Sequence, residues 1–131
     1  MKILIVEDEP LVAGSLRFLL ELEDHEVTGI ADDLESSLAA VESAWPELAL
    51  VDLGLARGTS GAEVAAALRR RNIACIFVSG NAPGRPQPEL ALGCLFKPYT
   101  DKALLGAIRV ADAFNNGLAR PTDTPEGLDL Y

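Results

Sequence analysis

The chain has 131 residues, of which 49% are apolar and only 5% aromatic, and its formal net charge is −9. This length suits one domain with an aliphatic core. The sequence has neither an apolar run long enough to cross a bilayer nor a signal peptide. Because the chain is acidic and its basic run is limited to 69–71, we do not expect direct nucleic-acid binding. Cys75 and Cys94 lie in apolar runs without metal-ligand spacing, which favours reduced thiols in a cytoplasmic protein.

Short apolar runs alternate with segments of helical periodicity in the first half of the chain. Ile3–Val6 is apolar without a break and predicts a strand buried on both faces, as in a parallel sheet. Pro10 suits the first turn of the helix that follows. The weaker run 26–31 indicates an edge strand. Asp32 with Glu35 resembles a capping box and predicts the start of a second helix.

The second half repeats this pattern with one irregular unit. Residues 48–51 and 73–78 predict buried strands, and 92–96 predicts a shorter one. Ser60 and Thr100 are the predicted N-caps of the two helices that follow the third and fifth strands. We therefore expect an α/β fold: a single doubly wound, five-stranded parallel sheet with helices on both faces.

Two segments depart from the regular pattern. Residues 80–88 contain three prolines and two glycines, so they cannot form a regular helix, and at most one helical turn fits before Leu92. We expect the domain to span 1–115, followed by a polar tail at 116–131. That tail is either a mobile end or a strap that docks through its last apolar residues, which are Leu128, Leu130 and Tyr131.

Polar side chains follow four of the predicted strands. Glu7 and Asp8 follow the first strand, Asp52 the third, Ser79 the fourth and Lys97 the fifth. Because the carboxyl ends of parallel strands share one edge, where ligands bind in open α/β sheets, we expect these side chains to lie together. Adjacent carboxylates repel there, and a hard divalent cation such as Mg²⁺, or a proton, would offset the repulsion. The alternative for the acids alone is a helix start that favours the dipole.

This set of side chains predicts phosphoryl transfer onto a carboxylate. Asp52 would attack phosphorus and become an aspartyl phosphate, while Mg²⁺ neutralises charge on the transferring group. Ser79 would hydrogen-bond a phosphoryl oxygen, and Lys97 would supply a fixed positive charge. Each residue also has an ordinary alternative: Ser79 could start a turn, Lys97 could pair with an acid, and Asp52 could cap a loop.

With these residues in place, the chain resembles a response-regulator receiver domain of the chemotaxis-regulator type over about residues 2–114. The motifs that carry the resemblance are Val6-Glu7-Asp8-Glu9, Val51-Asp52-Leu53, Val78-Ser79-Gly80 and Phe96-Lys97-Pro98-Tyr99. The resemblance implies a flavodoxin-like fold with strand order 2-1-3-4-5.

The resemblance also implies a role for each acid. Asp52 would be the phosphoacceptor, supplied by a phosphohistidine on a sensor kinase or a histidine phosphotransfer protein. Asp8 and Asp52 would bind Mg²⁺ directly, together with the main-chain carbonyl of Gly54, and Glu7 would act through water. Ser79 would be the switch hydroxyl. Members of the family usually hold the bond corresponding to Lys97–Pro98 in the cis form.

The sequence departs from the family pattern in three places. Cys94 stands where the switch aromatic is expected, which puts an aromatic relay of the usual kind in doubt. The loop 53–61 is one residue longer than common and lacks the usual proline. The helix expected after the fourth strand is replaced by 80–88, which is similar to a subgroup of stand-alone alphaproteobacterial receivers with a shortened or mobile fourth helix. Gly54 and Asn81 flank the site and are candidates for tuning the phosphoryl lifetime.

We therefore expect a single-domain regulator that switches a protein-binding surface or acts as a phosphate shuttle or sink. Without an output domain in the sequence, it would act on a separate downstream protein. We hypothesise that Ser79 moves toward the phosphoryl group and reorders the segment 80–88.

Three alternatives bear on this expectation. The first is a receiver-fold module that binds proteins without phosphorylation, although the intact set of polar residues argues against it. An enzyme acting on external substrates through an aspartyl intermediate would need a second acid two residues after the nucleophile, where Gly54 stands. We therefore expect chemistry only on the protein's own aspartate. A flavin-binding protein is disfavoured by the acidic site and the few aromatic residues.

Overall fold

The computed structural model describes residues 1–55, 58–80 and 85–131. Strands and helices alternate along the chain: β1 (Lys2–Val6), α1 (Pro10–Leu22), β2 (Glu26–Ala31), α2 (Leu34–Ser43), β3 (Leu48–Asp52), α3 (Gly61–Arg69), β4 (Ala74–Ser79), β5 (Gly93–Phe96), α4 (Asp101–Asn115) and β6 (Leu128–Leu130). No helix of the described ranges is long and apolar enough to cross a membrane.

The sheet has the order β2-β1-β3-β4-β5-β6, and β1 to β5 run parallel to one another. This confirms the predicted order 2-1-3-4-5. The register aligns the carboxyl ends of the strands, because Asp52 lies opposite Val78 and Ser79 lies opposite Phe96. The five polar residues predicted to share one edge therefore follow strand ends that do share one edge.

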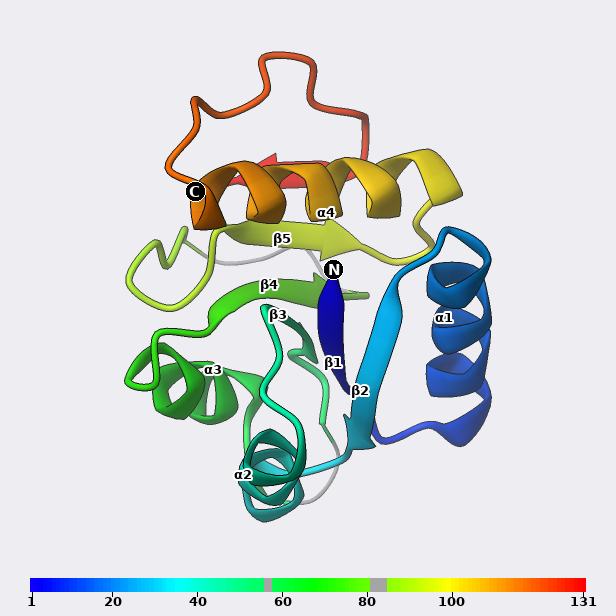
Figure 1. The fold of residues 1–131 in the computed structure, drawn as a ribbon, viewed down its shortest axis with the longest axis vertical. Helices are drawn as coiled ribbons and strands as arrows, with labels where there is room; N and C mark the ends of the chain where they lie inside the picture. Colours follow the sequence, from blue (N-terminus) through cyan, green and yellow to red (C-terminus); the bar gives the residue numbers. More distant parts are fainter. Residues whose placement is uncertain (56–57, 81–84) are drawn as a thin grey trace.

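Helices α1 and α4 cover one face of the sheet, and α2 and α3 cover the other (Figure 1). Apolar residues of α1 and α4, such as Leu16 and Leu104, pack on one face together with Ile3 and Ile5. Leu4 and Val6 point to the other face, where α2 and α3 contribute Val41, Val64 and Leu68. The run Ile3–Val6 is thus buried on both sides, as its unbroken apolar character predicted.

Helix capping agrees with the sequence at two positions and differs at one. Ser60 accepts a hydrogen bond from the Glu63 amide, and Thr100 caps α4 in the same way. The capping box predicted at Asp32 and Glu35 is wrong by one residue, because Asp33 is the N-cap and Ser36 reciprocates. The Ser36 hydroxyl reaches the Asp33 amide at 3.1 Å, while the Asp33 carboxylate accepts from the Ser36 amide at 2.8 Å.

The segment between β4 and β5 contains no regular helix in its described part. The amides of Leu90 and Ala91 both donate to the Gln87 carbonyl, which closes one helical turn, as expected before Leu92. The sequence-based hypothesis that the segment 80–88 is reordered includes residues 81–84. These residues, and Asn81 among them as a candidate for lifetime tuning, lie outside the described residues.

The prediction of a five-stranded sheet is incomplete, because β6 adds a sixth strand within the described ranges. After α4 the chain loops out and returns behind that helix to pair antiparallel with β5 (Figure 1). We call residues 118–131 the strap. Its short Leu-Asp-Leu strand is too brief to be recognised by alternation alone, and its pairing depends on the neighbouring β5 edge.

Candidate functional site

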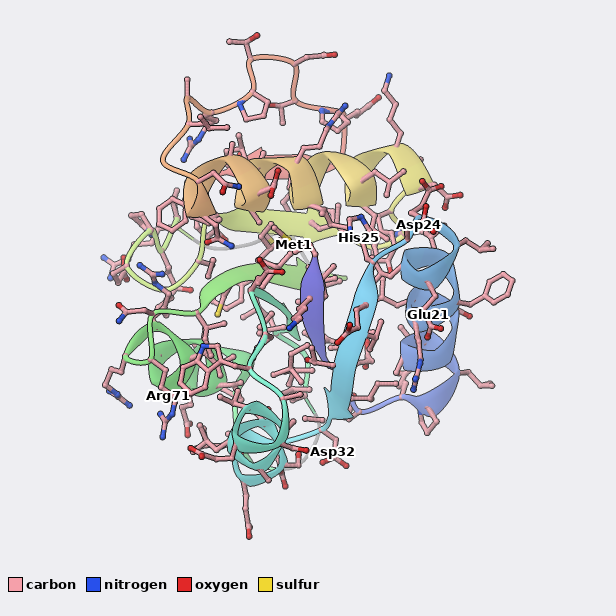
Figure 2. The ribbon with its side chains drawn as sticks, in the orientation of Figure 1. Met1, Glu21, Asp24, His25, Asp32 and Arg71 are labelled. Carbon is pink, nitrogen blue, oxygen red and sulfur yellow. The ribbon has the colours of Figure 1, made fainter. Side chains whose placement is uncertain are left out.

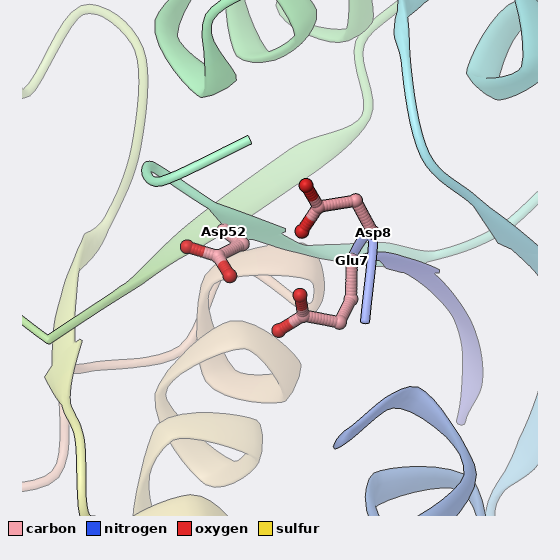
Figure 3. Close-up of side chains that lie close together, drawn as sticks. All are labelled: Glu7, Asp8 and Asp52. Atoms are coloured by element: carbon pink, nitrogen blue, oxygen red, sulfur yellow. The ribbon is translucent and has the colours of Figure 1, made fainter. Parts of the chain in front are cut away.

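Three carboxylates gather at the carboxyl ends of β1 and β3. Glu7 and Asp8 directly follow β1, and Asp52 is the last residue of β3. Carboxylate oxygens of the three residues all lie within 4.8 Å of one another, and Figure 3 shows the three side chains converging. Glu7 and Asp52 are each only 6% exposed, whereas Asp8 is partly exposed. The sequence-based prediction that these acids meet is confirmed by this geometry.

The side chain of Lys97 reaches the acids from the carboxyl end of β5. It follows β5, and its ammonium Nζ lies 3.0 Å from Glu7 Oε1 and 2.9 Å from Asp52 Oδ2. Its main-chain amide donates to the Ser79 carbonyl at 2.8 Å, and the bond from Lys97 to Pro98 is cis. Ser79 itself is 6% exposed and ends β4 at the same sheet edge.

Main-chain groups hold the acidic side chains in place. The Gly54 amide donates to Asp52 Oδ1 at 2.7 Å, and the Glu9 amide donates to Glu7 Oε2 at 3.1 Å. The Glu7 amide in turn donates to the Ala31 carbonyl at the end of β2. These bonds fix both buried carboxylates from the backbone, which favours their charged forms.

The two buried carboxyls respond to this environment in opposite directions. Burial, with Asp52 as hydrogen-bond partner, raises the pKa of Glu7 above its ordinary value. Burial also acts to raise the pKa of Asp52, but the Lys97 ammonium and the Gly54 amide outweigh it, so that pKa is lowered. Burial acts to lower the pKa of Lys97, but its hydrogen bonds to Asp52 and Glu7 outweigh burial and raise that pKa. Of the two carboxyls, Asp52 is therefore the one whose charged form this environment favours.

The donor set fits Mg²⁺. Three carboxylates and one ammonium carry two net negative charges when all are ionised, which a divalent cation would balance. Carboxylate oxygens are the ligands that hard cations prefer. Glu7, Asp8 and Asp52 are the residues that offer such oxygens here. The hydrogen bond from the Gly54 amide to Asp52 Oδ1 shows that the main chain at Gly54 lies beside these carboxylates.

The remaining predicted residues lie at different distances from this cluster. Cys94 is fully buried in β5 beneath the strap, and Pro98 is exposed next to Lys97. His25 lies at the opposite edge of the sheet, with its Nδ1 3.2 Å from the Met1 amino group (Figure 2). It therefore takes no part in the acidic cluster.

Sequence reasoning missed one residue that shapes the site. Gly61 opens α3 so close to β3 that an added Cβ would lie 2.4 Å from the Asp52 carbonyl oxygen. A side chain at this position would push α3 away from Asp52. The available signal was a glycine directly after the Ser60 cap, where a better helix former would be expected.

Comparison with known proteins agrees with this geometry. The family model described as "Response regulator receiver domain" matches residues 3–109. The phyllosphere-induced regulator PhyR of Methylorubrum extorquens is 35% identical over 111 residues, which cover 79% of this chain and 42% of that protein. The chain spans about half the length of the curated relatives it matches.

Solved structures show the same similarity. The signal receiver domain of a modulated diguanylate cyclase from Desulfovibrio desulfuricans G20 is 31% identical, with a TM-score of 0.79 over 88% of this chain and 95% of that one. The receiver domain of the PhyR response regulator from Erythrobacter litoralis is 27% identical, with a TM-score of 0.75 over 94% of this chain and 95% of that one.

Proposed function

Because this chain belongs to the response regulator receiver family, we propose that Asp52 accepts a phosphoryl group from a phosphohistidine of a sensor kinase or a phosphotransfer protein. A bond forms between a carboxylate oxygen of Asp52 and phosphorus while the phosphorus–nitrogen bond of the donor breaks, and the imidazole leaves. When bound, Mg²⁺ supplies positive charge that neutralises the transferring group. We assign its coordination to Asp8, Asp52 and the Gly54 carbonyl, with Glu7 acting through water.

The observation that carries this proposal is the buried Asp52 carboxylate, held between the Lys97 ammonium and the Gly54 amide. These two donors lower the pKa of Asp52, whereas burial raises the pKa of Glu7. Lys97 is then in place to neutralise charge that moves onto the phosphoryl oxygens. Ser79 ends the adjacent strand β4 at the same sheet edge, and its hydroxyl would hydrogen-bond a phosphoryl oxygen.

The proposed output is a change in a protein-binding surface, or transfer of the phosphoryl group to another protein. The aspartyl phosphate carries about two negative charges where the Asp52 carboxylate carried one, and this added charge beside Ser79 and Lys97 would draw both side chains toward the phosphoryl group. Turnover of external substrates is not part of the proposal, since a second acid placed as general base is missing at Gly54.

Intact-mass measurement with a small phosphodonor tests the proposal. We expect one phosphoryl adduct that requires Mg²⁺ and is lost in Asp52→Asn. Glu42→Gln, which removes an exposed acid of α2, is the matched control and should form the adduct normally. If neither an adduct nor a beryllofluoride complex forms, the phosphorylation-independent binding module becomes the better explanation.

A further inference from the structure

The strap lies on the β5 edge next to the candidate site. β6 pairs Leu128 with Leu95 and Leu130 with Gly93. Two further main-chain bonds extend this contact at both ends, since the Phe96 amide donates to the Gly127 carbonyl at 2.9 Å and the Tyr131 amide donates to the Leu92 carbonyl at 3.0 Å. Phe96 directly precedes Lys97, so the strap holds the end of the strand that delivers the site's ammonium.

The surface beneath the strap has two glycines that its docking requires. An added Cβ on Gly93 would lie 2.5 Å from the Asp129 carbonyl oxygen, and one on Gly106 would lie 2.5 Å from Pro125 Cγ. Gly106 lies inside α4, where glycine lowers helix stability relative to alanine. The helix therefore has a destabilising glycine where it contacts Pro125, which indicates that the contact is specific.

Side chains of the strap enter both hydrophobic layers. Leu128 is 7% exposed and packs in the layer beneath α1 and α4. Tyr131 packs in the opposite layer, with its ring edge-on to Phe77 at 6.5 Å between centroids, and its phenol lies close enough to the Cys94 thiol for each group to affect the pKa of the other. Phe77 lies two residues before Ser79 on β4, so the strap contacts both strands that carry the site's Ser79 and Lys97.

We propose that the strap is a latch whose docking is coupled to the state of Asp52, and that a phosphoryl group there favours its release. This inference rests on the proposed function. Lys97 now divides its ammonium between Glu7 and Asp52, and added charge on Asp52 draws it toward the phosphoryl group. This movement of Lys97 shifts the adjacent Phe96 and disturbs the hydrogen bond from its amide to the Gly127 carbonyl.

The charges of the strap explain why a phosphoryl group on Asp52 would favour its release rather than its docking. The strap carries Asp123, Glu126 and Asp129 against Arg120 as its one base, so a phosphoryl group at the neighbouring sheet edge repels it. Release uncovers the unpaired main chain of β5 beside Gly93 and Gly106. Such an edge accepts an extended apolar segment of another protein by strand addition.

Amide hydrogen exchange of the full chain, with and without Mg²⁺ and beryllofluoride, tests the latch. We expect faster exchange with beryllofluoride at the amides of Phe96, Leu128 and Tyr131, which donate to carbonyls within or beneath the strap. Amides within α1, which packs against β1 and β2, should keep their exchange rates. Unchanged or slower exchange at the three strap amides would overturn the proposal.

Because coupling is reciprocal, weakening the strap must strengthen binding at the site. Gly106→Ala adds a methyl group against Pro125 while improving the propensity of α4, so we expect this variant to bind beryllofluoride about 5-fold more tightly. Gly14→Ala, at an exposed helical glycine of α1 with nothing within 4 Å of its added Cβ, is the matched control and should bind like wild type. Tyr131→Ala is a second variant that loosens the strap without touching α4.

The same samples separate the two proposals. If wild type forms no Asp52 adduct and binds no beryllofluoride, the proposed function fails and the latch fails with it. If the adduct forms while Gly106→Ala and Tyr131→Ala bind beryllofluoride as wild type does, only the latch is overturned.

Discussion

The ammonium of Lys97 lies 2.9 Å from Oδ2 of Asp52, and this ion pair joins the carboxyl end of β3 to the residue that follows β5. The same ammonium also contacts Glu7, so one cation serves two carboxylates that are nearly inaccessible to solvent. Removing one partner of such a group leaves charge in a poorly solvated place.

Lys97→Met should therefore lower the free energy of unfolding by about 1–3 kcal/mol without divalent ions, less than for a fully buried pair because the lysine side chain is 28% exposed. Mg²⁺ should restore more stability to this variant than it adds to wild type, since it supplies the missing positive charge. Urea unfolding with and without Mg²⁺ measures both effects. Lys102→Met, at an exposed lysine of α4, is the control. Equal Mg²⁺ effects in Lys97→Met and wild type would contradict this account.

Mg²⁺ should raise the melting temperature of the wild-type protein, because an ion that binds only the folded state stabilises it by mass action. Asp8→Asn removes one of the three carboxylates that converge in Figure 3 and should weaken the effect at least 10-fold in Mg²⁺ concentration. Glu42→Gln should respond as wild type does. A Mg²⁺ response that survives in Asp8→Asn would place the ion elsewhere.

Two glycine-to-alanine changes should have opposite effects on stability. Gly61→Ala places a Cβ 2.4 Å from the Asp52 carbonyl oxygen, and we expect a loss of about 1–3 kcal/mol from the forced backbone shift. Gly14→Ala meets no neighbour in an exposed helix and should gain roughly 0.5–1 kcal/mol. Urea unfolding of both variants provides the comparison, and a neutral Gly61→Ala would show that α3 moves freely against β3.

Alkaline pH should loosen the strap through Tyr131. Burial, reinforced by Cys94 and Asp129, raises the pKa of Tyr131 from an ordinary value of 10 to about 12. Because the folded state favours the neutral phenol, its stabilising contribution is complete below pH 10 and is lost as pH rises through about 12. Urea unfolding across this range should show a decline that is smaller in Tyr131→Phe. Parallel declines in the two proteins would exclude Tyr131 as the cause.

Alkylation of the Cys94 thiol is an independent test of the packing of Tyr131 over Cys94. It is fully buried, and burial raises its pKa to about 11, so alkylation in the native protein should be slow at neutral pH. Tyr131→Ala should speed alkylation of Cys94, whereas Cys75, whose pKa burial raises to about 12, should stay protected. The modified cysteine is identified by peptide mass. Equal protection of Cys94 in both proteins would show that Tyr131 does not shield it.

Most of the fold was predictable because its signals are local. Ile3–Val6 is apolar without interruption, and 48–51 and 73–78 repeat that pattern, so parallel strands buried on both faces follow from hydrophobicity alone. The cap of α2 was misplaced because Asp32 and Asp33 are chemically equivalent, and only the backbone conformation selects Asp33.

The sequence by itself also determined which acids gather at the site, namely Glu7, Asp8 and Asp52, since parallel topology brings residues at the carboxyl ends of strands to one edge. What the tertiary structure alone decided is how distant segments meet. It sets the sharing of Lys97 between Glu7 and Asp52, the close approach of Gly61 to β3, and the docking of the strap on Gly93 and Gly106. These contacts depend on the fit of surfaces that are far apart in the chain, which neither local periodicity nor residue chemistry encodes.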